Sequence, residues 1–257
     1  MIRKFVIGDV RGELSLLKRL LDKIGPTSND QVIFTGSYVG PGEDSKGTVD
    51  YLLSLKKDLN LVCLRGCFEF MFGLCIETQP APATIRLWGD MGGRRVLNSY
   101  ASGKSIAFKD DVHSNLAEIS ASKLREVKDS LDVKKDGRYF TAEVEMCVPL
   151  EHLSFFADQH QWFEDDVYPF IVTHCGAHPV LFGGQIPNEE ATVFSEKNWW
   201  EDDGRRIPGK TVIFSHVPFK QPLVKPGKLG IDLGAGLGGC LCCFELYEHK
   251  FTIASPI

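Results

Sequence analysis

Five predicted strands each end at, or one to three residues before, a side chain of a kind found at metal or acid–base sites. These residues are Asp9, Ser37, Cys67, His174 and His216. The carboxyl ends of parallel strands meet at one edge of a sheet, where α/β proteins place their ligands, so we expect the five side chains to converge. Carboxylate, thiol and imidazole groups are typical ligands of transition metals. One such residue is explained by a turn or a core position, whereas five at corresponding positions favour a common site.

Strands that alternate with helices are predicted to position these residues. Apolar runs end at the polar positions, and between them leucines recur at helical spacing, most clearly from residue 14 to Ile24, before Gly25-Pro26. This alternation indicates βαβ units and a mostly parallel sheet. Near the end of the chain, residues 229–233, 241–246 and 251–254 are expected to form a closing antiparallel meander.

The composition is that of an ordinary globular protein. The 257 residues are 43% hydrophobic and 25% charged, with a net charge of −5. No basic block suggests nucleic acid as a partner, and no apolar run has membrane-spanning length. We expect a single domain over residues 1–257, with a charged insertion at about 101–147.

The cysteines and the N-terminus favour a cytoplasmic protein. The eight Cys are scattered and several lie in apolar strands, which fits buried free thiols in a reducing compartment better than a disulfide framework. The Cys-x-Cys-Cys run at 240–243 lacks a second pair of ligands for zinc. Because the N-terminus leads directly into a strand, we expect no signal peptide.

The motifs at the strand ends resemble those of the phosphoprotein phosphatase branch of the calcineurin-like metallophosphoesterases. This branch includes bacterial serine/threonine phosphatases and diadenosine tetraphosphatases. The resemblance covers almost the whole chain and implies an α/β fold in which two stacked mixed β-sheets are flanked by helices, an α-β-β-α sandwich. The segments that carry it are Gly8-Asp9-Val10-Arg11-Gly12, Gly36-Ser37-Tyr38-Val39-Gly40-Pro41-Gly42, Gly66-Cys67-Phe68-Glu69, His174-Cys175-Gly176 and Ser215-His216, with a supporting match at Ile231-Asp232-x-Gly234-Ala235.

The chain departs from the family pattern at the positions that carry the reaction. Members of the family hold two metal ions that share a bridging Asp, and a neighbouring His donates a proton. Of the metal ligands, only Asp9, His174 and His216 match. The replacements are Arg11 for a metal-binding His, Ser37 for the bridging Asp, Gly40 and Pro41 for an Asp and an Arg that orient the catalytic His and grip phosphate, Cys67 for an Asn, and Phe68 for the catalytic His.

These replacements together predict a pseudophosphatase without catalytic residues. Ser37 carries no charge to offset the repulsion between two divalent ions. Without that pair of ions, nothing lowers the pKa of an attacking water. Phe68 has no proton to give to a leaving oxygen.

Alternatives for the site remain open. No cofactor is expected, but Cys67 with the two histidines is a plausible set for one Zn or Mn ion, with Asp9 or water as a fourth ligand. Arg11 replaces the missing cation and pairs with Asp9, or, together with Arg65, binds a phosphorylated ligand.

Three functions follow from these readings. The first is binding of a protein partner or a phosphorylated small ligand without hydrolysis. The second is an active, divergent metal-dependent serine/threonine phosphatase or diadenosine polyphosphate hydrolase that uses Asp9, His174 and His216. The third is a structural interaction module that uses the insertion at about 101–147.

Overall fold

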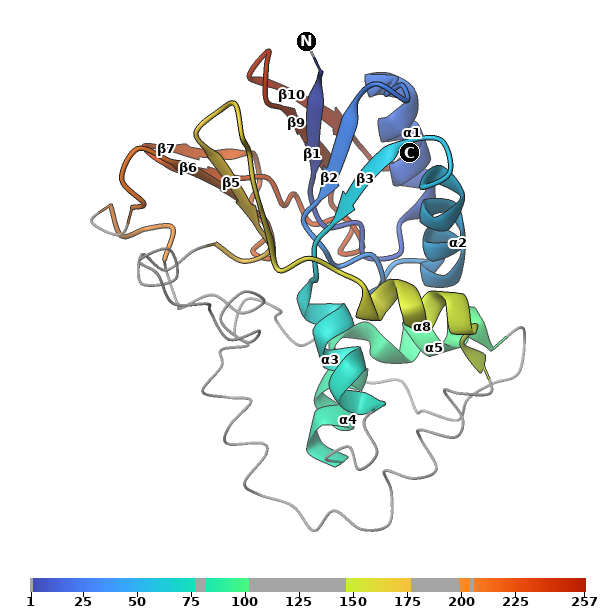
Figure 1. Ribbon diagram of the computed structural model, residues 1–257. Helices are drawn as coiled ribbons and strands as arrows, with labels where there is room; N and C mark the ends of the chain where they lie inside the picture. Colours follow the sequence, from blue (N-terminus) through green and yellow to red (C-terminus); the bar gives the residue numbers. More distant parts are fainter. Residues whose placement is uncertain (1, 77–81, 102–146, 177–198, 204–205) are drawn as a thin grey trace.

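Two five-stranded β-sheets form the centre of the molecule, and helices cover the first sheet and its lower edge (Figure 1). The computed structural model describes residues 2–76, 82–101, 147–176, 199–203 and 206–257. The predicted insertion at about 101–147 lies almost entirely outside these residues. The fold class predicted from the sequence, two stacked mixed sheets flanked by helices, is confirmed.

The first sheet has the strand order β10-β9-β1-β2-β3. Its strands β1, β2 and β3 run parallel, as predicted, whereas β9 pairs antiparallel with both β1 and β10. The sheet is therefore mixed. The bounds of its strands are β1 Lys4–Ile7, β2 Gln31–Phe34, β3 Asn60–Cys63, β9 Leu241–Glu245 and β10 Lys250–Ala254.

The second sheet has the strand order β4-β5-β6-β8-β7. Strands β5, β6 and β8 are parallel, and β4 and β7 run antiparallel at the two edges. The bounds are β4 Trp162–Glu164, β5 Phe170–Thr173, β6 Thr211–Phe214, β7 Leu223–Lys225 and β8 Lys228–Gly230.

The predicted closing meander is wrong. Strand β8 belongs to the second sheet, where it pairs with β6 and β7. Of the three segments predicted for the meander, β9 and β10 are the two that pair antiparallel with each other. The chain crosses from one sheet to the other between Gly230 and Leu241. All of these strands have similar apolar patterns, so their partners are decided by long-range packing that the local sequence does not record.

Side chains alternate between the two faces of each strand, and this alternation builds two cores. On β1, Val6 faces the second sheet, while Phe5 and Ile7 face the helices. On β9, Cys242 and Cys243 divide in the same way. The adjacent cysteines of the 240–243 run are therefore buried on opposite faces of the sheet.

Helices α1 and α2 cover the outer face of the first sheet (Figure 1). Helix α1 buries four leucines against it and ends at Gly25, whose amide donates to the Leu21 carbonyl. Helix α2 begins at Ser45, where the Asp44 carboxylate caps the amide of Gly47. The helix bounds are α1 Leu14–Ile24, α2 Ser45–Leu55, α3 Cys67–Cys75, α4 Pro82–Trp88, η1 Gly89–Gly93, α5 Arg94–Tyr100 and α8 Leu150–Ala157.

Helices α3, α4, α5 and α8 gather below the carboxyl ends of β1, β2 and β3 (Figure 1). Only Leu64, Arg65 and Gly66 separate β3 from α3, so the start of α3 lies at the edge where the parallel strands end. Within the described part of the chain, no helix is long and apolar enough to cross a membrane.

Candidate functional site

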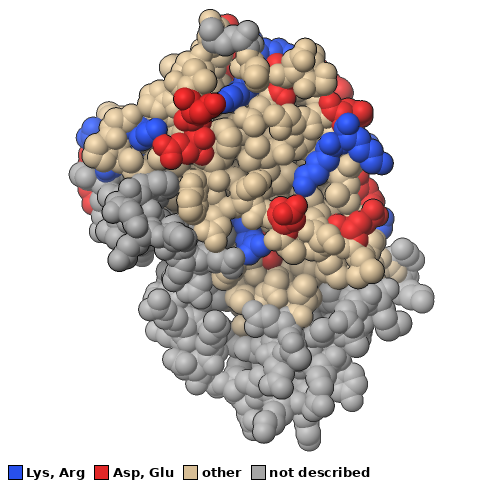
Figure 2. Space-filling model, in the orientation of Figure 1, with Lys and Arg blue, Asp and Glu red and all other residues tan. Residues whose placement is uncertain are grey.

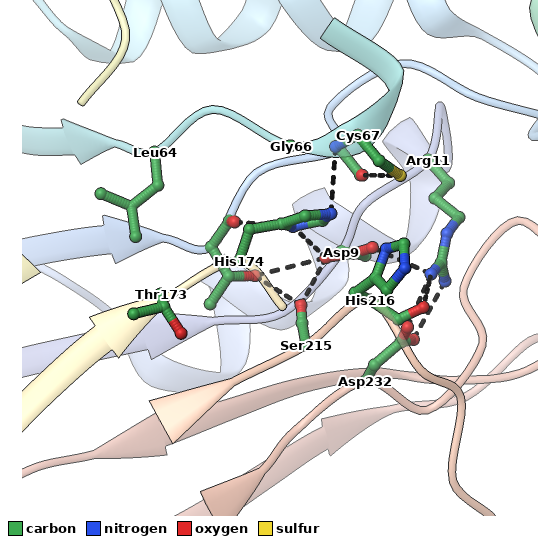
Figure 3. A network of polar contacts seen from close by, with 12 residues as sticks. Asp9, Arg11, Leu64, Gly66, Cys67, Thr173, His174, Ser215, His216 and Asp232 are labelled. Atoms are coloured by element: carbon green, nitrogen blue, oxygen red, sulfur yellow. Dashed lines mark hydrogen bonds and ion pairs between the residues drawn. The ribbon is translucent and has the colours of Figure 1, made fainter. Parts of the chain in front are cut away.

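Four of the five polar residues predicted at the strand ends come together between the two sheets (Figure 3), and the fifth, Ser37, lies against one of them, Cys67. The Ser37 hydroxyl lies 3.6 Å from the Cys67 sulfur. The ring centroids of His174 and His216 are 5.1 Å apart, and His174 Nδ1 lies 3.5 Å from Asp9 Oδ1. We call these five residues together with Arg11 and Asp232 the strand-end cluster.

Three turns of the strand-end cluster hold non-glycine residues in the left-handed region of backbone space. The φ angles are 48° at Arg11, 52° at Ser37 and 71° at His216. Such angles are uncommon for side-chain-bearing residues and concentrate at functional sites. The surrounding structure therefore holds these three turns in an uncommon backbone conformation.

Glu69, on the first turn of α3, holds the turn that carries Ser37. Its buried carboxylate accepts backbone amide hydrogens from Ser37 at 2.9 Å, Tyr38 at 2.8 Å, Val39 at 3.2 Å and Gly66 at 3.2 Å. Burial raises the pKa of Glu69 to about 7, and these hydrogen bonds oppose that shift. The sequence analysis quoted Glu69 within a motif but did not single it out as a positioning residue.

Glycine is required where the turns after β2 and β3 meet. A Cβ at Gly66 would lie 2.0 Å from the Ser37 amide nitrogen, and one at Gly36 would lie 2.5 Å from the Gly66 nitrogen. This close approach brings Cys67 and Ser37 into contact.

His174 is fully buried, and both of its ring nitrogens are engaged. Nδ1 lies 3.0 Å from the Thr35 carbonyl oxygen, which can only accept, so Nδ1 carries the hydrogen. Nε2 then accepts the Cys67 amide hydrogen at 3.0 Å. Burial lowers the pKa of His174 to about 3, and the charge of Arg11 acts in the same direction. His174 is therefore neutral and its lone pair is already in use.

Asp9 is held from both sheets. Its Oδ1 atom accepts a short hydrogen bond from the Ser215 hydroxyl, which also lies 2.7 Å from Thr35 Oγ1. Its Oδ2 atom lies 2.9 Å from Arg11 Nη2. Burial raises the pKa of Asp9 to about 6, while Arg11 acts to lower it. The partner of Asp9 is a side-chain cation, as one of the sequence alternatives expected.

Arg11 makes its strongest contact with a residue that the sequence analysis did not place in the site. Nη1 and Nη2 donate to Asp232 Oδ1 and Oδ2 at 3.0 and 2.6 Å. The same two nitrogens also face the carbonyl oxygens of Ala235 at 3.4 Å and His216 at 3.2 Å. The position of Asp232, just after an apolar strand and before Gly234, was the signal available in the sequence.

The two arginines predicted to bind a phosphorylated ligand both contact other groups of the chain. Arg11 is 1% exposed and its two terminal nitrogens face two carboxylates and two carbonyls. Arg65 directs Nη2 to the Ala157 carbonyl at the end of α8, 3.0 Å away. Arg11 is thus occupied within the strand-end cluster, and ligand binding by Arg11 and Arg65 stays a prediction.

Comparison with known proteins places the chain in a family. The sequence model of the calcineurin-like phosphoesterases matches residues 2–227. The chain belongs to this family. No match was found among the curated proteins.

Solved structures agree with this calcineurin-like phosphoesterase fold. A putative diadenosine tetraphosphatase is similar with a TM-score of 0.60 and 16% identity, covering 98% of this chain and 92% of that one. A metallophosphoesterase from Sphaerobacter thermophilus has a TM-score of 0.50 and 13% identity, covering 100% and 88%. A protein serine/threonine phosphatase from Saccharomyces cerevisiae has a TM-score of 0.50 and 10% identity, covering 100% and 80%. At these identities the likeness shows the fold alone.

Four of the positions where this phosphoesterase departs from its family carry no ionisable side chain: Ser37, Gly40, Pro41 and Phe68. Ser37 is fully buried, and Phe68 is fully buried in the core between the first sheet and its helices. Pro41 packs near Gly92 of η1, and Gly40 lies against the stem of Arg11.

The three side chains predicted to bind a single metal ion lie close together, but two of them are engaged in ways that oppose metal binding. Ligand atoms of Cys67, His174 and His216 lie within 4.8 Å of one another, and this donor set suits zinc. However, His174 Nε2 already accepts the Cys67 amide, and burial raises the pKa of the Cys67 thiol, so the thiolate is disfavoured. The fixed charge of Arg11 also lowers the pKa of both histidines and would repel a dication. In this arrangement the residues do not fit a bound metal.

Proposed function

We propose that this calcineurin-like phosphoesterase does not hydrolyse phosphoesters and acts instead as a binding protein, a pseudophosphatase. The burial of the strand-end cluster carries the proposal. Asp9, Arg11, Ser37, Cys67, His174, His216 and Asp232 are each at most 4% exposed. A hydrolytic centre must present its reacting groups to substrate and water, which this cluster does not do.

The chemistry of the cluster supports the same proposal. Ser37 supplies no negative charge where a family member has the bridging carboxylate, and Phe68 supplies no proton. Arg11 directs its terminal nitrogens to Asp9 and Asp232, so these nitrogens are not available to stabilise charge on a phosphoryl group. Parts that act as a unit are missing together, which leaves little for the remaining ones to do.

A protein partner is the better-supported ligand. A cavity of about 310 Å³ lies at the start of α1, but its charged lining includes Glu13, Glu43 and Asp44 against a single Lys18. An excess of carboxylates is unfavourable for a phosphorylated small ligand. The face in Figure 2 mixes acidic and basic side chains, which supports the proposal that nucleic acid is not a partner. A cytoplasmic location remains part of the proposal, supported by eight cysteines that form no disulfide bond.

The second candidate is an active, divergent hydrolase. The proximity of Cys67, His174 and His216 favours it, because a rearranged cluster offers three ligands. Its substrates would be of the kinds named for the neighbours, a phosphoprotein or a diadenosine polyphosphate.

Turnover of an aryl phosphate in excess Mn²⁺, with a metal count on the same sample, separates the two candidates. We expect the wild-type protein to show no more turnover than His216→Ala. His160→Ala is the matched control, because His160 is exposed and its backbone, which the substitution keeps, makes the hydrogen bonds to Cys63 and Arg65. Manganese-dependent turnover that His160→Ala keeps and His216→Ala abolishes would overturn the proposal. A phosphopeptide and a diadenosine polyphosphate should be assayed in parallel.

A further inference from the structure

The Arg11 guanidinium joins loops that belong to both sheets (Figure 3). Arg11 and Asp9 lie in the loop after β1 of the first sheet. Asp232 follows β8, and the His216 carbonyl follows β6, both in the second sheet. One cationic side chain therefore holds two buried carboxylates and the ends of strands from each layer.

Two glycines leave the space that the Arg11 stem occupies. A Cβ at Gly40 would lie 2.9 Å from Arg11 Cβ and 3.3 Å from its Cγ. A Cβ at Gly236 would lie 2.7 Å from Arg11 Cβ. The arginine is thus enclosed along its stem as well as paired at its head.

We propose that the Arg11 guanidinium is a built-in replacement for a metal cation, and that truncating it uncovers a buried cation site formed by Asp9 and Asp232. Nη2 lies 2.9 Å from Asp9 Oδ2 and 2.6 Å from Asp232 Oδ2, so without it two desolvated carboxylates would face each other. Buried unpaired charges are strongly unfavourable. A small cation that enters the vacated space is then bound tightly.

The preferred ligand of the uncovered site is a planar guanidinium ion. The Asp232 carboxylate already accepts two parallel N–H groups, a geometry that an ammonium ion cannot reproduce. Truncation to Ala removes an ethylguanidinium fragment, so that ion restores the missing atoms. A small divalent cation is the second choice.

This inference goes beyond the proposed function, and its test does not measure hydrolysis. Thermal unfolding is followed for the wild type and for Arg11→Ala, Arg11→Met and Arg3→Ala, each in about 10 mM ethylguanidinium chloride or KCl. We expect Arg11→Ala alone to gain Tm in ethylguanidinium, saturably and by about 5 °C. Arg11→Met fills the cavity with an uncharged side chain and should not respond.

Arg3→Ala is the matched control for the loss of a bidentate pair. Arg3 donates to both oxygens of Asp30, at 3.1 and 2.6 Å, but its side chain is 40% exposed. Its removal opens no buried cavity, so its Tm should not depend on which salt is present.

Two outcomes would overturn the inference. In the first, Arg11→Ala responds to ethylguanidinium no more than Arg11→Met or the wild type does. In the second, the wild type loses Tm in EDTA and regains it with Mn²⁺ or Zn²⁺, which would show that a metal holds the site alongside the arginine.

If Arg11→Ala does not fold, a second variant and a refolding assay test the inference. Arg11→Lys keeps the positive charge but lacks the two parallel N–H donors of the guanidinium. Its Tm should lie between those of the wild type and Arg11→Met. Refolding of Arg11→Ala from urea should yield more folded protein in ethylguanidinium than in KCl. Equal yields, together with Arg11→Lys no more stable than Arg11→Met, would contradict the inference. Turnover by the wild type would contradict the proposed function alone.

Discussion

Arg11 and Asp232 form a buried bidentate ion pair between residues 221 positions apart, with N–O distances of 3.0 and 2.6 Å. The pair joins the loop after the first strand to the crossing from the second sheet back to the first. Because the Arg11 side chain is 1% exposed and that of Asp232 is fully buried, neither charge is solvated when its partner is removed. The stability of the two-sheet interface therefore depends on this contact.

Removing either side chain of this pair should lower the free energy of unfolding, and the two decreases should not be additive. We expect Arg11→Met and Asp232→Asn each to lower the free energy of unfolding by about 3–5 kcal/mol. The decrease in the double variant should be roughly 2 kcal/mol smaller than the sum of the two single decreases. Urea unfolding measures all three values. Additive losses would mean that the two side chains act independently. Arg3→Met should cost less than Arg11→Met, because the Arg3 side chain is 40% exposed and Asp30 keeps its hydrogen bonds from Thr27.

Glu69→Gln should loosen the turn that carries Ser37. The carboxylate accepts four backbone amides, and the amide side chain of Gln places hydrogens against some of them. We expect a loss of about 3 kcal/mol in the free energy of unfolding. Faster hydrogen exchange should appear at the amides of residues 37–39. The exposed Glu151→Gln on α8 is the control and should change stability by less than about 0.5 kcal/mol; unchanged exchange at 37–39 would contradict the role of Glu69.

The stability that His152 contributes should decrease as the pH falls. His152 is buried between α2 and α5, with Nε2 3.0 Å from Asp50 Oδ1 and Nδ1 2.8 Å from the Tyr100 hydroxyl. Burial lowers its pKa, while Asp50 and Glu151 act to raise it and Lys46 to lower it. With the folded pKa below the unfolded value, only the unfolded chain gains a proton as the pH drops below about 6.5, so the contribution is complete above that pH and is lost below it.

The measurement is the difference in free energy of unfolding between the wild type and His152→Gln from pH 7 to pH 5. We expect this difference to shrink by up to about 1.4 kcal/mol for each pH unit. For the exposed His160→Gln, the difference from the wild type should stay within about 0.5 kcal/mol throughout. A difference that grows on acidification would show the opposite sign of shift.

Only two cysteines should react quickly with a thiol reagent in the folded protein. Cys147 and Cys240 are partly exposed, and the other six cysteines are buried. Burial also raises the pKa of Cys67 and Cys175, which suppresses the reactive thiolate. Alkylation followed by peptide mapping should label all eight only in urea. Cys240→Ser should reduce the fast-reacting number to one, and fast labelling of Cys67 in the native protein would contradict the described burial.

The local sequence determined the strands that end at the polar positions, the first helix and the polar residue after each of these strands. Apolar runs of three or four residues and leucines at helical spacing are short-range patterns, and short-range patterns set secondary structure. Asp9, His174 and His216 could be placed at one edge for the same reason, because parallel strands share that edge.

Only the tertiary structure decided which sheet received β8, and with it which carboxylate received Arg11. The pairing of β8 with β6 and the contact between Arg11 and Asp232 join distant segments, and neither leaves a local periodicity in the chain. A guanidinium in a first-turn loop is equally compatible with solvent, with phosphate or with a buried carboxylate. Packing selected the carboxylate, because enclosure between two sheets removes water and makes a paired charge the only stable one.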